Sequence, residues 1–139
     1  MSFNIKLAEV VRGDPRYAYE AYEFIFQALQ FTQKKLGREP DLKSLQAHPA
    51  GEPQHHVSGR ELLEGVRHFA LHEFGLMART VLHMWGIRKT ADFGEIVFNL
   101  IDAGLMSRTP DDSKADFHDV FDLDQALVEG YQIQLDEVR

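Results

Sequence analysis

The residues best placed for chemistry are two histidines that stand four positions apart. On a helix, His68 and His72 would present both imidazoles on one side, a spacing that lets them bind a single metal ion, with Glu64 one turn earlier. The segment 68–73 reads His-Phe-Ala-Leu-His-Glu, which is not the His-Glu-x-x-His order of zinc peptidases. All three residues also fall on the polar face of the expected helix, where solvated histidines are common. We therefore expect no metal and no other cofactor, with His68 and His72 as the only candidate ligands.

The triplet Asp92-Phe93-Gly94 repeats the letters of the kinase magnesium motif without that motif's surroundings. It follows Thr90 at the expected start of a helix, no glycine-rich phosphate loop accompanies it, and 139 residues are too few for a kinase. The chain has no cysteine, which excludes a thiolate metal site and a cysteine nucleophile. No glycine-flanked serine of the hydrolase type is present either. We therefore predict that the protein is not an enzyme.

Acidic side chains are concentrated at the end of the chain. Residues 1–109 hold 13 acidic and 13 basic residues, whereas residues 110–139 hold nine acidic residues against two basic ones, so this segment accounts for the net charge of −7. Such a segment repels phosphate backbones and favours a basic partner surface, although solubility would explain it equally well. We predict a partner-binding surface of carboxylates, formed by Asp92, Glu95, Asp102, Asp111, Asp112, Asp116 and Asp119.

The first 37 residues are expected to form two helices. The first covers 4–12, and Asp14-Pro15 then reads as the cap and first residue of a long second helix that runs to Leu36 and ends at Gly37. The apolar residues of the second helix recur at helical spacing, which predicts a buried central helix. Residues 38–57 contain three prolines among polar residues, which predicts a long loop.

Three further helices are expected after this loop. Ser58 and Glu61 have the spacing of a capping box, so the first of them begins here and breaks at Gly75. The next covers Met77 to Trp85. Thr90 is expected to cap the third, which ends at Gly104 and contains Gly94 at a cost of about 1 kcal/mol relative to alanine. Close packing of another segment would explain Gly94.

The segment after the third helix is expected to form a two-stranded ribbon. Leu105–Arg108 and Phe117–Phe121 are the candidate strands, joined by a turn at residues 110–113. Phe117 and Phe121 would share one face of the second strand, but the apolar Val120 falls on the other, so apolar and polar residues do not alternate cleanly. A helix over 113–121 is therefore the main alternative. Asp122 or Asp124 should then cap a short helix, and residues 131–139 form a tail.

Residues 58–127 resemble an uncharacterised family of short proteins restricted to planctomycete and verrucomicrobial bacteria. The segments 56–65 (His-Val-Ser-Gly-Arg-Glu-Leu-Leu-Glu-Gly) and 92–100 (Asp-Phe-Gly-Glu-Ile-Val-Phe-Asn-Leu) carry this resemblance, and residues 14–17 and 32–37 extend it. The resemblance implies no activity. His56 belongs to the first segment, and we expect it to bond the backbone at the helix entry rather than a ligand.

These patterns predict a mainly α fold with a small β-hairpin. A single domain over 1–139 would place a long N-terminal helix on a winged-helix-like three-helix unit at 58–130. The expected recognition helix exposes Asp92, Glu95 and Asp102 but no lysine or arginine, which disfavours DNA. We therefore expect a non-catalytic adaptor whose acidic C-terminal surface meets a basic protein. A nucleic-acid-binding regulator is the alternative, and a metal-binding protein or enzyme is less favoured. No membrane segment or signal peptide is evident, which predicts a cytoplasmic protein.

Overall fold

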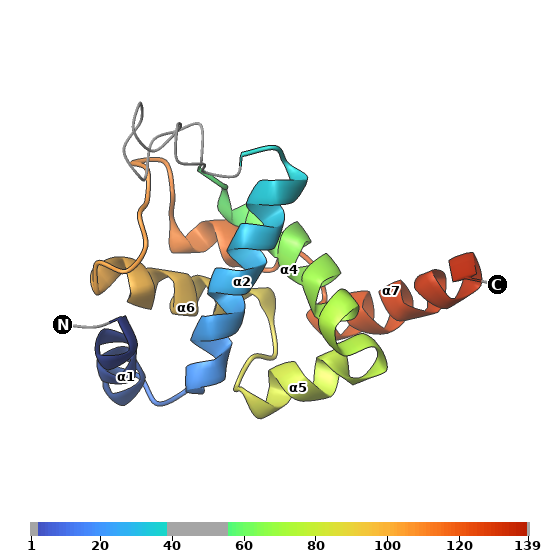
Figure 1. The fold of residues 1–139 in the computed structure, drawn as a ribbon, viewed down its shortest axis with the longest axis horizontal. Coiled ribbons are helices and arrows are strands. Elements are labelled where there is room, and N and C mark those ends of the chain that lie inside the picture. Colours follow the sequence, from blue (N-terminus) through green and yellow to red (C-terminus); the bar gives the residue numbers. More distant parts are fainter. Residues whose placement is uncertain (1–2, 39–55, 139) are drawn as a thin grey trace.

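The computed structural model describes residues 3–38 and 56–138, and every regular element within these ranges is helical (Figure 1). Most of the predicted loop at 38–57 therefore lies outside the described residues. The prediction of a mainly α protein is confirmed. The elements are α1 (Phe3–Gly13), α2 (Tyr19–Lys35), α4 (Gly59–Phe74), η2 (Gly75–Met77), α5 (Ala78–Met84), α6 (Thr90–Asp102), η3 (Lys114–Phe117) and α7 (Leu123–Val138).

The centre of the fold is the crossing of α2 and α4, with α1 and α6 on one side and α5 and α7 on the other (Figure 1). The helices approach closely because Gly65 of α4 lies against the buried Thr32 of α2, where a β-carbon at position 65 would overlap the threonine hydroxyl. That hydroxyl donates a hydrogen bond to the Ala28 carbonyl at 2.7 Å, so its burial leaves no polar group unsatisfied. The prediction of a buried central helix is confirmed.

An aromatic cluster fills the space between α2, α4 and α5. The ring of Phe24 lies 5.5 Å from Phe69, 5.9 Å from Phe74 and 5.7 Å from Trp85, measured between centroids. Rings at these separations make favourable tilted and edge contacts beyond the effect of burial alone. The aliphatic part of the core comes from six helices and includes Leu7, Ile25, Leu63, Val66, Leu82, Ile96, Leu100, Leu123 and Leu127.

The capping box at the start of α4 is confirmed. The Ser58 hydroxyl accepts from the Glu61 backbone N–H at 3.2 Å, and the Glu61 carboxylate accepts from the Ser58 N–H at 3.0 Å. Arg38, just beyond α2, also donates to Glu61 at 2.8 Å, so one carboxylate joins the end of α2 to the start of α4. This arginine holds the pKa of Glu61 below its ordinary value, with help from the Ser58 N–H.

The predicted start of the second helix at Asp14 is wrong. The helix begins at Tyr19, because the Asp14 carboxylate accepts from both the backbone N–H and the guanidinium of Arg16 and closes a turn instead. The residues after this turn serve tertiary contacts, since Tyr17 is buried and the Ala18 N–H donates to the Trp85 carbonyl at 3.1 Å.

The predicted β-hairpin is absent, so the winged-helix-like assignment is also wrong. Residues 105–113 form no strand, and the short helix η3 ends at Phe117, where the second strand was predicted to begin; residues 118–121 form a turn and a bend. Two side-chain caps decide this outcome: Asp112 accepts from the Thr109 N–H at 2.8 Å, and Asp116 accepts from the Ser113 N–H at 3.0 Å. These carboxylates satisfy backbone donors of the segment between the two predicted strands and fold it into capped turns. The helical alternative for 113–121 was closer.

The last helix is longer than predicted. The Asp122 carboxylate accepts from the Gln125 N–H at 3.0 Å, which is a helix N-cap contact at one of the two predicted positions. From Leu123 the helix α7 runs through the expected tail to Val138. Leu123 and Leu127 are buried against the body, and the C-terminal turns extend beyond the other helices (Figure 1).

Candidate functional site

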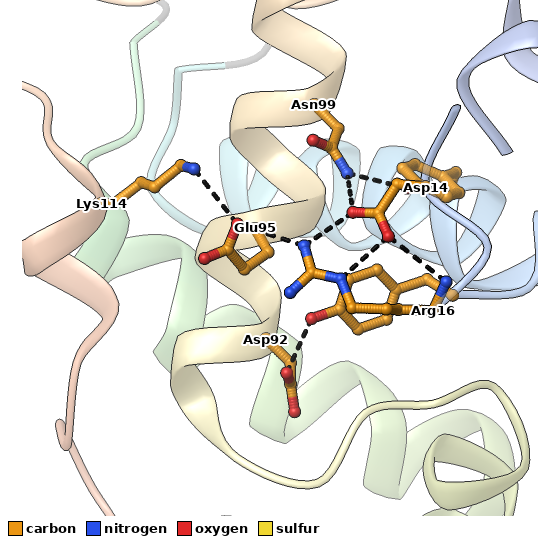
Figure 2. A network of polar contacts seen from close by, with 8 residues as sticks. Asp14, Arg16, Asp92, Glu95, Asn99 and Lys114 are labelled. Carbon is orange, nitrogen blue, oxygen red and sulfur yellow. Dashed lines mark hydrogen bonds and ion pairs between the residues drawn. The ribbon is translucent and has the colours of Figure 1, made fainter. Parts of the chain in front are cut away.

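The face of α6 that carries predicted partner-binding carboxylates is joined to the turn between α1 and α2 (Figure 2). The Asp14 carboxylate takes two bonds from the Arg16 guanidinium, at 2.7 and 2.8 Å, and one from Asn99 of α6 at 2.8 Å. The Asn99 amide also donates to the Tyr22 hydroxyl at 3.1 Å. Arg16, supported by Asn99, holds the pKa of Asp14 well below its ordinary range. Bidentate contact of this kind is the strong form of an ion pair.

Glu95 lies in the same network, between two cations from opposite ends of the chain. Its carboxylate is 3.1 Å from the Lys114 ammonium and 3.4 Å from the Arg16 guanidinium (Figure 2). Lys114, then Arg16, lowers the pKa of Glu95. The Glu95 side chain is 29% exposed. Lys114 and Arg16 compensate its charge within the chain, before any partner approaches.

The Asp92 carboxylate accepts three hydrogen bonds at the start of α6. It accepts from the Tyr17 hydroxyl at 2.7 Å and from the backbone N–H groups of Arg88 and Lys89 at 2.9 and 3.1 Å. Burial, and then the neighbouring Asp92, raises the pKa of Tyr17 above its ordinary value. Asp92 therefore does the capping that was predicted for Thr90. The Thr90 hydroxyl instead donates to the Phe117 carbonyl at 2.6 Å and accepts from the Val120 N–H at 3.3 Å.

The remaining predicted carboxylates fall into two groups. Asp112 and Asp116 stabilise turns in the segment after α6, as described above. Asp102, Asp111 and Asp119 are exposed to solvent. Asp119 has a φ of 49°, a left-handed conformation that aspartate tolerates better than most residues. The structure thus brings Asp92 and Glu95 together in one internal network and leaves only part of the predicted set at the surface.

His56 pairs with a side chain rather than with the backbone at the helix entry. Its Nε2 lies 3.1 Å from one Asp112 oxygen and 3.2 Å from the other, and both side chains are less than a quarter exposed. The His56 carbonyl accepts from the Arg38 guanidinium at 3.1 Å. This pair stands at the edge of a cavity that the sequence did not indicate.

The cavity has a volume of about 310 Å³ and lies between α2, α4, α6 and the segment that follows α6. Its walls are mainly apolar, with Phe26 and Leu29 from α2, Leu62 from α4, and Val97 and Ile101 from α6. Its size falls at the lower end of the range for sites that hold small molecules or single large side chains. We call it the inter-helix pocket; its other lining residues are Gln33, His56, Val57, Gly59, Phe98, Gly104, Leu105, Met106, Ser107, Asp112 and Phe117.

Charged groups surround one side of the inter-helix pocket. Asp112 lines it, Asp111 is exposed next in the chain, and Asp102 is exposed beside the lining residue Ile101. Arg108 adjoins the lining residue Ser107, and it lies over the Phe98 ring at 5.3 Å while donating to the Asp112 carbonyl at 3.0 Å. Sequence reasoning missed the pocket because its walls come from four separated segments, each of which reads as ordinary core.

The candidate metal ligands His68 and His72 contact different carboxylates. His68 Nε2 is 3.9 Å from Glu64, and His72 Nδ1 is 3.7 Å from its neighbour Glu73, with the His72 side chain 74% exposed. Partial burial, and then Lys35, lowers the pKa of His68. Among the described residues, no three histidine, aspartate or glutamate side chains are grouped so that they could hold an ion.

Within the described residues, no helix has the length and apolar character required to cross a membrane. The wing on which the nucleic-acid alternative depended is absent, and α6 itself carries no lysine or arginine.

No protein-family model, no curated protein and no solved structure matches the chain.

Proposed function

We propose that the protein is a non-catalytic interaction module that holds an apolar side chain of a basic partner in the inter-helix pocket. The pocket is the observation that carries this proposal. It offers about 310 Å³ of mainly apolar space. Interfaces between proteins commonly depend on a few large side chains that enter such pockets and lose their water there.

The charges around the pocket support a basic partner. Asp102 and Asp111 are exposed on the two segments that form one wall, and Asp112 lies in that wall. A lysine or arginine next to the inserted apolar residue would meet these carboxylates, which favours correct orientation and faster association. Two exposed residues of the predicted acidic surface, Asp102 and Asp111, therefore adjoin residues that line the pocket, whereas Asp92 and Glu95 serve the fold.

His56 and Asp112 give the pocket a polar edge. Their contact at 3.1 Å fixes the orientation of the imidazole, and Gln33 and Ser107 add hydrogen-bonding groups to the lining. A few polar groups on an apolar pocket set the direction in which a ligand enters, because its backbone must satisfy its own donors and acceptors there. We infer that the partner presents a peptide segment rather than a flat surface.

Selection of peptides from a random displayed library tests this proposal on the full chain. We expect the enriched peptides to share one large apolar residue next to lysine or arginine. Their binding, measured by fluorescence anisotropy, should fall at least about tenfold in Met106→Glu, which places a charge in the pocket wall. Ile5→Glu is the matched control, since Ile5 is 52% exposed on α1 and does not line the pocket.

Three outcomes would contradict the proposal. Enriched peptides that are acidic would contradict the charge assignment. Peptides that bind Met106→Glu as well as the unaltered protein would show that the pocket is not used. A protein that takes up free apolar compounds in the pocket but enriches no peptide would be a small-molecule carrier instead.

A further inference from the structure

Of the described residues that line the inter-helix pocket, Asp112 alone carries a carboxylate. Its side chain is 17% exposed, and His56 Nε2 lies 3.1 Å from one of its oxygens and 3.2 Å from the other. These nearly equal distances place the imidazole nitrogen midway between the two oxygens. A guanidinium that forms paired hydrogen bonds takes the same position relative to a carboxylate.

His56 is a weaker partner than the cations that bind other carboxylates of this fold. Those pairs are Asp14 with Arg16, Glu61 with Arg38, and Glu95 with Lys114. A histidine is charged only when it is protonated, and its Nε2 donates one hydrogen bond where the fork of a guanidinium donates two. His56 therefore lies on a carboxylate that an arginine would bind more strongly.

The Asp112 carboxylate is also held in place by its own turn. One oxygen accepts from the Thr109 N–H at 2.8 Å, and the Asp112 N–H donates back to the Thr109 carbonyl at 3.1 Å. Arg108 donates to the Asp112 carbonyl at 3.0 Å, and its guanidinium lies over the Phe98 ring. Because these contacts do not involve His56, the carboxylate keeps its orientation when His56 leaves. A group that is oriented in advance loses little freedom on binding, which favours affinity.

We propose that an arginine of the partner replaces His56 on the Asp112 carboxylate when the partner's apolar side chain enters the inter-helix pocket, an inference that rests on the function proposed above. In the free protein, His56 keeps a carboxylate at the edge of an apolar pocket paired. Lysine fits less well, because a single ammonium group does not match both oxygens. Recognition then requires an apolar residue and an adjacent arginine, and partners without arginine do not displace His56.

Peptide selection from a random displayed library, run in parallel on the unaltered full chain and on Asp112→Asn, tests this assignment. We expect arginine rather than lysine beside the apolar residue in peptides from the unaltered protein, and no such preference in peptides from Asp112→Asn. Asparagine keeps an oxygen that can accept from the Thr109 N–H, so the fold should survive, which circular dichroism checks. Asp116→Asn is the matched control, because Asp116 caps the next turn through the Ser113 N–H and is not one of the described lining residues.

The best enriched peptide and its citrulline variant measure the contact itself, because citrulline keeps the shape of arginine without its charge. By fluorescence anisotropy, this exchange should weaken binding to the unaltered protein at least about tenfold and binding to Asp112→Asn less than about twofold. His56→Leu removes the competing contact, so it should bind the arginine peptide about threefold more tightly, with no gain for the citrulline peptide. A purely structural role of His56 would instead lower the affinity for both peptides.

Four outcomes would overturn the proposal. Lysine could be enriched as strongly as arginine, or the citrulline exchange could have the same effect on Asp112→Asn as on the unaltered protein. His56→Leu could bind the arginine peptide no more tightly. Peptides that share only the apolar residue would overturn this inference while leaving the pocket as a binding site. An unaltered protein that enriches no peptide would overturn the function proposed above, and this inference with it.

Discussion

Phe117 packs directly onto Gly94, so closely that a β-carbon at position 94 would lie 2.9 Å from the Phe117 β-carbon. Phe117 is only 3% exposed, and its burial contributes about 1.5–3 kcal/mol. This contact explains a glycine inside α6 that helix propensity alone disfavours. It also takes the place of the expected hairpin, because Phe117, which was assigned to a strand, packs against Gly94 of α6 instead.

We expect Gly94→Ala to destabilise the protein by about 1–3 kcal/mol, because the added methyl group must displace Phe117 from a packed core. Helix propensity acts in the opposite direction by about 1 kcal/mol, so the steric term must exceed it. Urea unfolding measures the difference. Gly13→Ala is the control, since a β-carbon there meets nothing within 4 Å. A more stable Gly94→Ala protein would show that Phe117 is not held there.

Thr90→Val should lower the free energy of unfolding by about 1–3 kcal/mol. Valine keeps the shape of threonine but removes the hydroxyl that donates to the Phe117 carbonyl and accepts from the Val120 N–H. Hydrogen exchange at the Val120 amide should accelerate together with this loss. Thr80→Val on the exposed side of α5 should be nearly neutral. Equal effects of the two changes would contradict a special role for Thr90.

Acid should destabilise the fold through Asp14, Glu61 and Glu95, whose pKa values are all lowered. A carboxylate with a lowered pKa contributes stability above its ordinary pKa, and this contribution is lost as pH falls through the folded-state value. We expect Asp14→Asn to cost about 1–3 kcal/mol near neutral pH and to show a shallower loss of stability below about pH 4. Denaturation across this pH range gives both quantities. Asp102→Asn should reproduce neither effect, since Asp102 is exposed.

High pH should destabilise the fold through Tyr17, whose pKa is raised. A raised pKa means that the stabilising contribution is present below the ordinary tyrosine pKa of about 10 and is lost as pH rises through the folded-state value. Tyr17→Phe should therefore lower stability by about 1–2 kcal/mol at neutral pH and reduce the alkaline loss. Tyr19→Phe is the control, because the Tyr19 hydroxyl makes an exposed contact with Asn4. A Tyr17→Phe protein with an unchanged alkaline limit would contradict the assignment.

Helix positions were predictable where short-range chemistry decides them. The Ser58–Glu61 box, the apolar spacing of α2 and the glycines after α2, α5 and α6 each act within a few residues, and all are confirmed. The start of α2 was not predictable in this way. Asp14 and Pro15 are ordinary helix-start residues, but Asp14 is bound by Arg16 and by Asn99, which lies 85 positions away in the sequence.

The region after α6 shows the second limit of the sequence. Turn residues at 110–113 were recognised, yet whether such residues join strands or cap helical turns depends on which backbone donors the nearby carboxylates reach. Thr90 and Gly94 of α6 decide which of these forms, because Thr90 bonds the Phe117 carbonyl and Gly94 packs against the Phe117 side chain. The inter-helix pocket was invisible for the same reason, since its wall residues become neighbours only after the helices pack. Charge counting located acidic residues correctly but could not distinguish exposed Asp111 from Glu95, which Arg16 and Lys114 compensate.

Arg38 has a practical consequence for altering this chain. It donates to the His56 carbonyl, 18 positions away, and to the Glu61 carboxylate, 23 positions away. Both acceptors lie at the start of α4. Replacing Arg38 would therefore release both contacts at once, so any redesign of the end of α2 or the start of α4 must keep this arginine.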